Sequence, residues 1–139
     1  MKPDNITIET VIEASIQKVW ECYTRTEHVI NWNFADPSWE CPSAQNDLKV
    51  GGKFSYRMQA KDGSTGFDFE GEYIDVRDLN CIKYVMEDGR KVEIYFEKLD
   101  ENTTHLTIDF DIEQINPAEM QRGGWQSILD NFKKYVEKL

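Results

Sequence analysis

The sequence predicts a single α+β domain, residues 1–139, in which a curved antiparallel sheet wraps around a long C-terminal helix. Residues 116–139 carry apolar side chains at helical spacing in one continuous stripe. Residues 5–12 and 43–113 instead alternate between apolar and polar side chains, as strands do, and short turns separate the segments. Each strand therefore has one apolar face that needs a cover. No other helix is long enough to cover it, so the sheet must curl around the terminal helix.

The first part of the chain predicts one strand followed by two short helices. Asn5–Ile12 alternates strictly and should form the strand. Ser15 can cap a short helix that has one apolar face. A second short helix is expected at residues 26–32, with Thr26 as its cap. Residues 33–42 then form an aromatic-rich loop that two prolines interrupt.

The middle of the chain predicts a meander of about six antiparallel strands. The expected strands are residues 43–48, 53–60, 67–76, 81–87, 91–99 and 105–113. The mid-strand Gly71 and the pair Gly51–Gly52 are suitable places for the sheet to bend. Asp68, Glu70 and Glu72 alternate with Phe69 and Tyr73, so they should face water. A general acid or base role for them would need a bulge that reverses the two faces.

The terminal helix has a recognisable start. Asn116 can cap it, and Pro117 suits the first helical position. Trp125 and Phe132, on the apolar stripe, should be almost fully buried. Two adjacent glycines, residues 123–124, interrupt the helix, and each costs roughly 1 kcal/mol relative to alanine. They would be explained by a kink or close packing against a strand, or by room for a ligand.

Composition excludes several classes of function. The net charge of −10 argues against binding to nucleic acid and to anionic membrane surfaces. No apolar run is long enough to span a membrane. The three cysteines, Cys22, Cys41 and Cys81, lack the spacing of a disulfide framework or a metal site, so we expect free thiols. With no signal-peptide core at the N-terminus, these thiols favour a cytoplasmic location.

No motif for catalysis, metal binding or a cofactor is present in the sequence. His105 falls on the charged face of its strand, where we expect it to be solvated. His28 lies near the aromatic loop, where it would pack on the surface or handle a proton at a cavity mouth. Neither has a Cys or Asp partner at a catalytic spacing. We therefore expect no catalytic residue, no metal and no cofactor.

Motifs spread over nearly the whole chain carry a family resemblance. They are Ile12-Glu13-Ala14-Ser15 with Val19-Trp20, Asp47-Leu48-Lys49-Val50-Gly51-Gly52-Lys53-Phe54, Phe69-Glu70-Gly71-Glu72-Tyr73 and Gly124-Trp125. With them the chain resembles the START-like (SRPBCC) superfamily and, within it, homologues of the activator of the heat-shock protein 90 ATPase. One departure is Trp32-Asn33-Phe34, where many members have two tryptophans followed by glycine.

The resemblance implies a helix-grip fold with a deep, mostly apolar cavity between the helix and the sheet. Inward-facing side chains would line this cavity or, alternatively, fill a solid core. The candidate ligand-binding residues are Trp32, Phe34, Tyr56, Met58, Phe69, Tyr73, Tyr84, Met86, Gly124 and Trp125. The loop at residues 32–34 should form the entrance. We expect an apolar small-molecule ligand, which is lipid-like, aromatic or polyketide-like. The alternatives are a chaperone-regulating protein that acts through its acidic surface and a cyclase-type enzyme.

Overall fold

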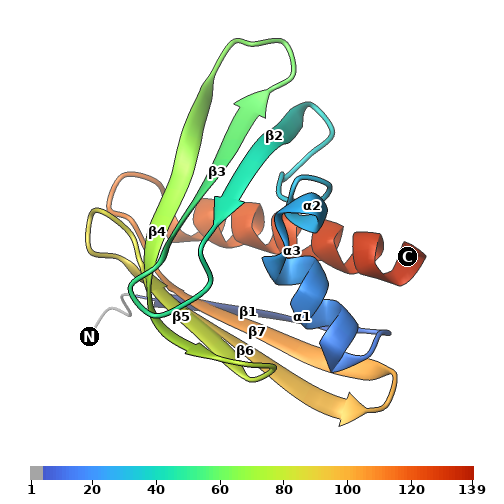
Figure 1. The fold of residues 1–139 in the computed structure, drawn as a ribbon. Helices are drawn as coiled ribbons and strands as arrows, with labels where there is room; N and C mark the ends of the chain where they lie inside the picture. The colour runs from blue at the N-terminus through green and yellow to red at the C-terminus, as the bar shows by residue number, and fades with distance from the viewer. Residues whose placement is uncertain (1–4) are drawn as a thin grey trace.

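The computed structural model describes residues 5–139 and confirms the predicted α+β architecture (Figure 1). Seven antiparallel strands form one curled sheet in the order β1-β7-β6-β5-β4-β3-β2, and the long helix α3 lies across its concave side. The elements are β1 (Asn5–Ile12), α1 (Ile16–Thr24), α2 (Thr26–Val29), β2 (Trp39–Asn46), β3 (Lys53–Ala60), β4 (Gly66–Arg77), β5 (Cys81–Val85), β6 (Lys91–Asp100), β7 (Thr103–Asp111) and α3 (Ala118–Lys138). The predicted six-strand meander is thus β2 to β7.

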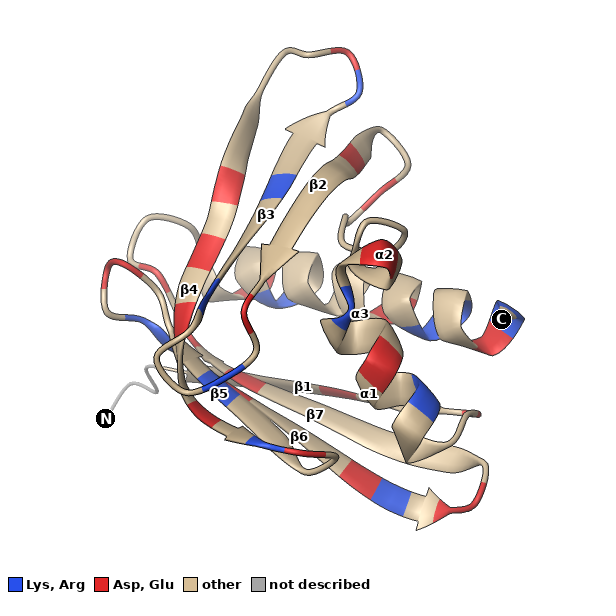
Figure 2. Cartoon of the chain, in the orientation of Figure 1, with Lys and Arg blue, Asp and Glu red and all other residues tan. Residues whose placement is uncertain are grey.

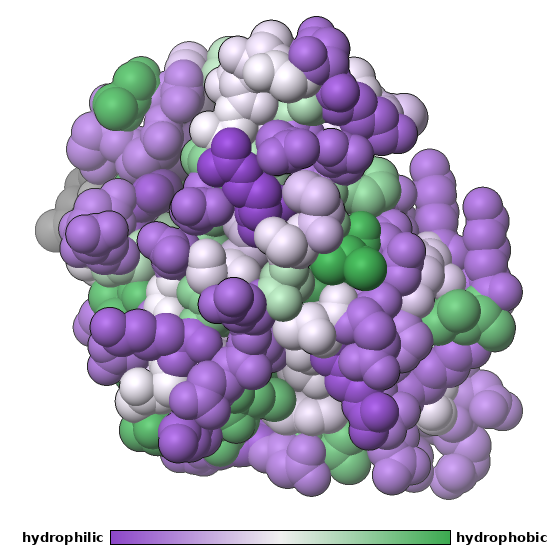
Figure 3. Space-filling view, turned by 45° about the horizontal axis from the view of Figure 1, so that its top comes forward, coloured by the Kyte–Doolittle hydropathy of each residue, from purple (hydrophilic) through white to green (hydrophobic). Residues whose placement is uncertain are grey.

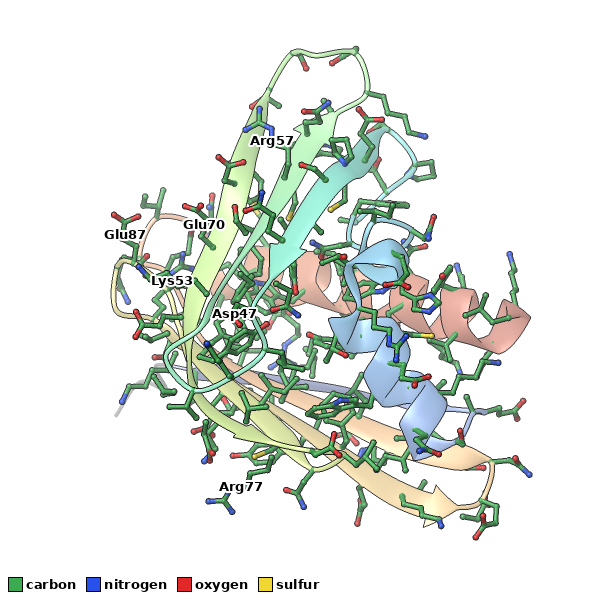
Figure 4. The ribbon with its side chains drawn as sticks, in the orientation of Figure 1. Asp47, Lys53, Arg57, Glu70, Arg77 and Glu87 are labelled. Atoms are coloured by element: carbon green, nitrogen blue, oxygen red, sulfur yellow. The ribbon has the colours of Figure 1, made fainter. Side chains whose placement is uncertain are left out.

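The two faces of the sheet differ as the alternation predicts. Along β7, buried and partly exposed side chains alternate without interruption. On the outer face Arg57 of β3 approaches the Asp68 carboxylate of β4 at 3.5 Å, and Ser55 donates a hydrogen bond to Glu70. Figure 4 shows Arg57 and Glu70 pointing away from α3. Asp68, Glu70 and Glu72 are therefore solvated, as predicted. Figure 2 shows that charged residues occur on strands, helices and turns alike.

Several elements differ from their predicted bounds, most clearly α2, which ends at Val29, and β2. Ser15 caps α1 as expected and accepts a hydrogen bond from the backbone N–H of Lys18. Thr26, however, is the first residue of α2 rather than its cap. Helix α2 follows α1 directly, so Arg25 is both the C-cap of α1 and the N-cap of α2. Strand β2 begins at Trp39, earlier than predicted, and contains Pro42. The proline is tolerated because β2 is an edge strand whose pairing shifts register there.

The start of α3 also differs from the prediction. Asn116 does not cap the helix; its side chain donates a hydrogen bond to Glu113, and Pro117 occupies the cap position without a side-chain hydrogen bond. The buried side chain of Gln121 instead orders the connection from β7. Its amide nitrogen donates to the carbonyls of Glu113 and Asn116, and its oxygen accepts from the Glu113 N–H.

Helix α3 covers the open edge of β1. Arg122 donates a hydrogen bond to the carbonyl of Thr7 at 3.1 Å, and Lys133 donates to that of Val11 at 2.6 Å. An uncovered edge strand exposes unpaired carbonyls and invites pairing with another chain. Basic side chains of α3 therefore satisfy part of this edge while its apolar stripe covers the sheet.

The core lies between the sheet and the three helices. From the predicted stripe of α3, Leu129, Phe132 and Val136 are fully buried, whereas Leu139 is exposed. The thiols of Cys22, Cys41 and Cys81 are buried and unpaired, as predicted. No helix within residues 5–139 is long and apolar enough to cross a membrane.

Candidate ligand cavity

A cavity of about 270 Å³ lies between α3 and the concave face of the sheet. Its walls come from α1, the segment after α2, strands β3 to β7 and α3. Eight of the ten residues predicted from the sequence line it: Trp32, Tyr56, Met58, Phe69, Tyr73, Tyr84, Met86 and Trp125. The fold therefore brings together side chains from segments far apart in the sequence around one space.

Two of the predicted residues, Phe34 and Gly124, do not line the cavity. Phe34 is partly buried against the core, and its carbonyl lies 3.5 Å from the side-chain nitrogen of Asn131 on α3. Apart from the chain neighbours and the backbone of α3 itself, a Cβ atom built on Gly123 or Gly124 meets no atom within 4 Å. Close packing against a strand therefore does not explain the two glycines.

Sequence reasoning did not select several other residues that line the cavity. They are chiefly Tyr23, Phe54, Ile128, Leu129 and Phe132. Periodicity had already placed all of them on apolar faces. It could not separate them from ordinary core residues, because apolar residues have the same spacing along a strand or helix whether they line a cavity or fill a packed interior.

Aromatic contacts hold the cavity walls in place. The Trp125 ring stacks on Phe110 at 4.1 Å with an interplanar angle of 8°, and Phe69 meets it edge-on at 6.1 Å. The Tyr84 ring meets Phe54 edge-on at 4.7 Å. Trp125 lines the cavity and is only partly buried, contrary to the expectation of nearly full burial.

The segment after α2 is fixed at two points. The indole N–H of Trp32 donates to the Cys22 carbonyl of α1 at 2.9 Å. Asn131 on α3 donates to the Trp32 carbonyl at 2.8 Å. Trp32 and the buried Asn33 line the cavity, so this segment places both an indole and a side-chain amide at its wall.

Four tyrosines, Tyr23, Tyr56, Tyr73 and Tyr84, line the cavity. The Tyr73 hydroxyl donates to the Asn46 side-chain oxygen at 2.5 Å. Burial raises the pKa of Tyr73 to about 12 and also raises the pKa of Tyr23, Tyr56 and Tyr84. All four are therefore neutral phenols near pH 7 and can each donate a hydrogen bond.

The two charged residues at the cavity wall already have partners. The Arg90 guanidinium lies 2.7 Å from the Asp88 carboxylate, and the Glu113 carboxylate accepts hydrogen bonds from Asn116. The wall is consequently apolar, with uncharged hydroxyl and amide groups as its available polar atoms.

Both histidines lie away from the cavity wall. His105 lies on the outer face between Glu9 and Glu97, as its phase predicts. The ring of His28 is 2.6 Å from the Tyr135 hydroxyl, and neither residue lines the cavity. Within residues 5–139, His, Cys, Asp and Glu side chains do not cluster in a way that could hold a metal ion.

Comparison with known proteins identifies close relatives. The family model described as "Activator of Hsp90 ATPase homolog 1-like protein" matches residues 13–137. A solution structure of an AHSA1-like protein from Aeromonas hydrophila is 40% identical and has a TM-score of 0.90, over 96% of this chain and 92% of that one. A solution structure from Cytophaga hutchinsonii is 46% identical with a TM-score of 0.84, over 98% and 94%.

More distant structures share the fold alone. A crystal structure of a protein from Nitrosomonas europaea has a TM-score of 0.82 at 16% identity, over 96% of this chain and 94% of that one. A search of curated proteins gave no match.

Proposed function

The chain belongs to the family of Activator of Hsp90 ATPase homolog 1-like proteins, and from this membership and its cavity we propose that it binds a small hydrophobic molecule. The ligand would lie between α3 and the inner faces of the long strands, and would enter past residues 32–34. The observation that carries the proposal is the cavity of about 270 Å³ with its aromatic wall. Small-molecule sites are typically concave, mostly apolar and equipped with a few polar groups.

The size of the cavity restricts the ligand. Small-molecule sites span roughly 300–1,000 Å³, so this cavity is at the small end. The ligand should therefore be compact, such as a molecule with two aromatic rings, rather than a long lipid. The face in Figure 3 is mainly hydrophilic, with apolar residues in small, separate patches, so on this face a larger apolar surface for binding is not present.

Titration with the neutral fluorescent probe N-phenyl-1-naphthylamine tests this proposal. The wild-type protein should bind the probe and increase its fluorescence. Ile128→Trp should lower the affinity at least about tenfold, because the larger side chain takes up cavity space. The matched control is Ser127→Trp, since Ser127 is the exposed neighbour of Ile128 on α3.

Thermal unfolding of both variants shows whether a loss of binding reflects a loss of folding. If the wild type binds no probe, or if Ile128→Trp binds as well as the control, the cavity is not the binding site.

A second candidate function rests on the family description, which names an activator of the Hsp90 ATPase. Under this alternative the acidic outer surface would contact a chaperone, in line with the net charge of −10. Pull-down of purified heat-shock protein 90 with the wild-type protein tests it, with Ile128→Trp as the variant that separates the two functions. Chaperone binding that survives this substitution would support the second candidate, and no capture at low ionic strength would reject it.

A further inference from the structure

The tyrosines of the cavity suggest the chemistry of its ligand, and this inference rests on the proposed binding function. Tyr84 is only 5% exposed, and within residues 5–139 neither its hydroxyl nor that of Tyr23 has a hydrogen-bond partner. Both residues line the cavity. Among the described residues no buried side-chain oxygen or nitrogen lacks a partner, so these two hydroxyls are not sealed in the core. They are open to the cavity, where a water or a ligand atom can accept their hydrogen bonds.

The tyrosines that carry these hydroxyl groups come from different elements and line the same cavity. Tyr23 belongs to α1, Tyr73 to β4 and Tyr84 to β5, and the Tyr73 and Tyr84 rings are 6.4 Å apart. Burial is the main cause of the raised pKa of Tyr84, and the neighbouring Tyr23 and Tyr73 both add to it. The Tyr73 hydroxyl already donates to Asn46. Tyr56 in turn interacts with Tyr73 through a side-chain hydrogen bond. Among the described residues, Tyr23 and Tyr84 therefore remain as the cavity tyrosines whose hydroxyls have no protein partner.

We propose that the hydroxyls of Tyr23 and Tyr84 donate hydrogen bonds to an acceptor oxygen of an uncharged, compact ligand, such as the carbonyl of an aromatic ketone. The acceptor would lie at the tyrosine cluster, and the apolar part would lie against the aromatic walls. A carbonyl oxygen has two lone pairs and can accept from two donors at once.

A neutral acceptor fits the cavity better than a carboxylate. Burial of an ionised carboxylate is unfavourable unless a cation is close. Arg90, the cation at the cavity wall, is paired with Asp88 at 2.7 Å. The chain also carries a net charge of −10, which opposes the entry of an anion.

Three probes with the same two rings test the proposal by equilibrium dialysis at pH 7: benzophenone, diphenylmethane and diphenylacetate. Diphenylmethane lacks the acceptor oxygen, and diphenylacetate replaces it with a charged group. Tyr84→Phe and Tyr23→Phe should each weaken benzophenone about two- to tenfold, because each removes one hydrogen bond. Both variants should leave the affinity for diphenylmethane within about twofold.

Tyr95→Phe is the control variant, since its hydroxyl bonds Glu93 and Tyr95 does not line the cavity. If Tyr84→Phe and Tyr23→Phe lower the affinity for benzophenone and for diphenylmethane equally, the proposed hydrogen bonds are overturned, while the proposal that the cavity binds a ligand still stands. Tighter binding of diphenylacetate than of benzophenone would also overturn it, in favour of an anionic ligand. If none of the three probes binds, the proposed function and this inference both fail.

Discussion

At the scale of single residues, two glycines show how the same residue type has opposite consequences in two environments. A Cβ atom at Gly71 of β4 would lie 2.6 Å from the Phe54 ring and 2.9 Å from the Tyr84 ring. The missing side chain thus makes room for two rings of the inner face, next to the register shift at residues 73–75. Gly123 on α3 instead has, apart from its chain neighbours and the backbone of its own helix, no atom within 4 Å of its Cβ position.

Alanine substitution at these two glycines should therefore change stability in opposite directions. Gly71→Ala should lower the free energy of unfolding by about 1–3 kcal/mol, because the added methyl group overpacks the interior. Gly123→Ala should raise it by about 1 kcal/mol, because alanine favours the helix. Urea denaturation of both variants measures the two effects, and a stabilised Gly71→Ala would contradict the packing described here.

At the scale of elements, His105 joins three neighbouring strands on the outer face. Its Nε2 lies 2.9 Å from the Glu9 carboxylate of β1, and its Nδ1 lies 3.1 Å from the Glu97 carboxylate of β6. Only the protonated ring can donate to both carboxylates, since neutral imidazole has one N–H. These hydrogen bonds, first to Glu9 and then to Glu97, raise the pKa of His105 above its ordinary value of 6.5.

A raised pKa in the folded state predicts a definite pH dependence. The contribution of His105 to stability should be fully present below pH 6.5 and should disappear as the pH rises through the folded-state pKa. His105→Gln should therefore destabilise the protein more at pH 6 than at pH 9, as measured by urea denaturation at both values. A difference between variant and wild type that does not change with pH would refute this role.

At the scale of the whole molecule, Phe132 connects the helices of the interior. Its ring meets Trp32 at 4.7 Å and Tyr23 of α1 at 5.2 Å, and it is fully buried. Phe132→Ala should lower the free energy of unfolding by about 3–5 kcal/mol, because it leaves a void where α1, α3 and the Trp32 segment meet.

The neighbouring substitution Lys134→Ala is the control for Phe132→Ala. Lys134 is exposed on the opposite side of α3, so the change should stay within about 0.5 kcal/mol. Thermal and denaturant unfolding of both variants compares them. Similar stabilities would mean that α3 is not the centre of the core.

The sequence alone determined the elements and the fold class. The alternation in 53–60 and the helical spacing in 116–139 predicted β3 and α3 correctly, because backbone geometry fixes these periods whatever the neighbours are. The periods also identified which side of each strand is apolar. That was enough to infer a sheet curled around the helix.

Only the tertiary structure decided what the interior contains. Whether Tyr56 and Tyr84 fill a core or face a space depends on the distance between β3, β5 and α3, and thus on side chains far apart in the sequence. The same holds for hydroxyl partners, since Asn46 reaches Tyr73 while Tyr84 has no partner in the described chain. Periodicity gives the direction of a side chain, but volume and hydrogen bonding arise only when separate elements pack together.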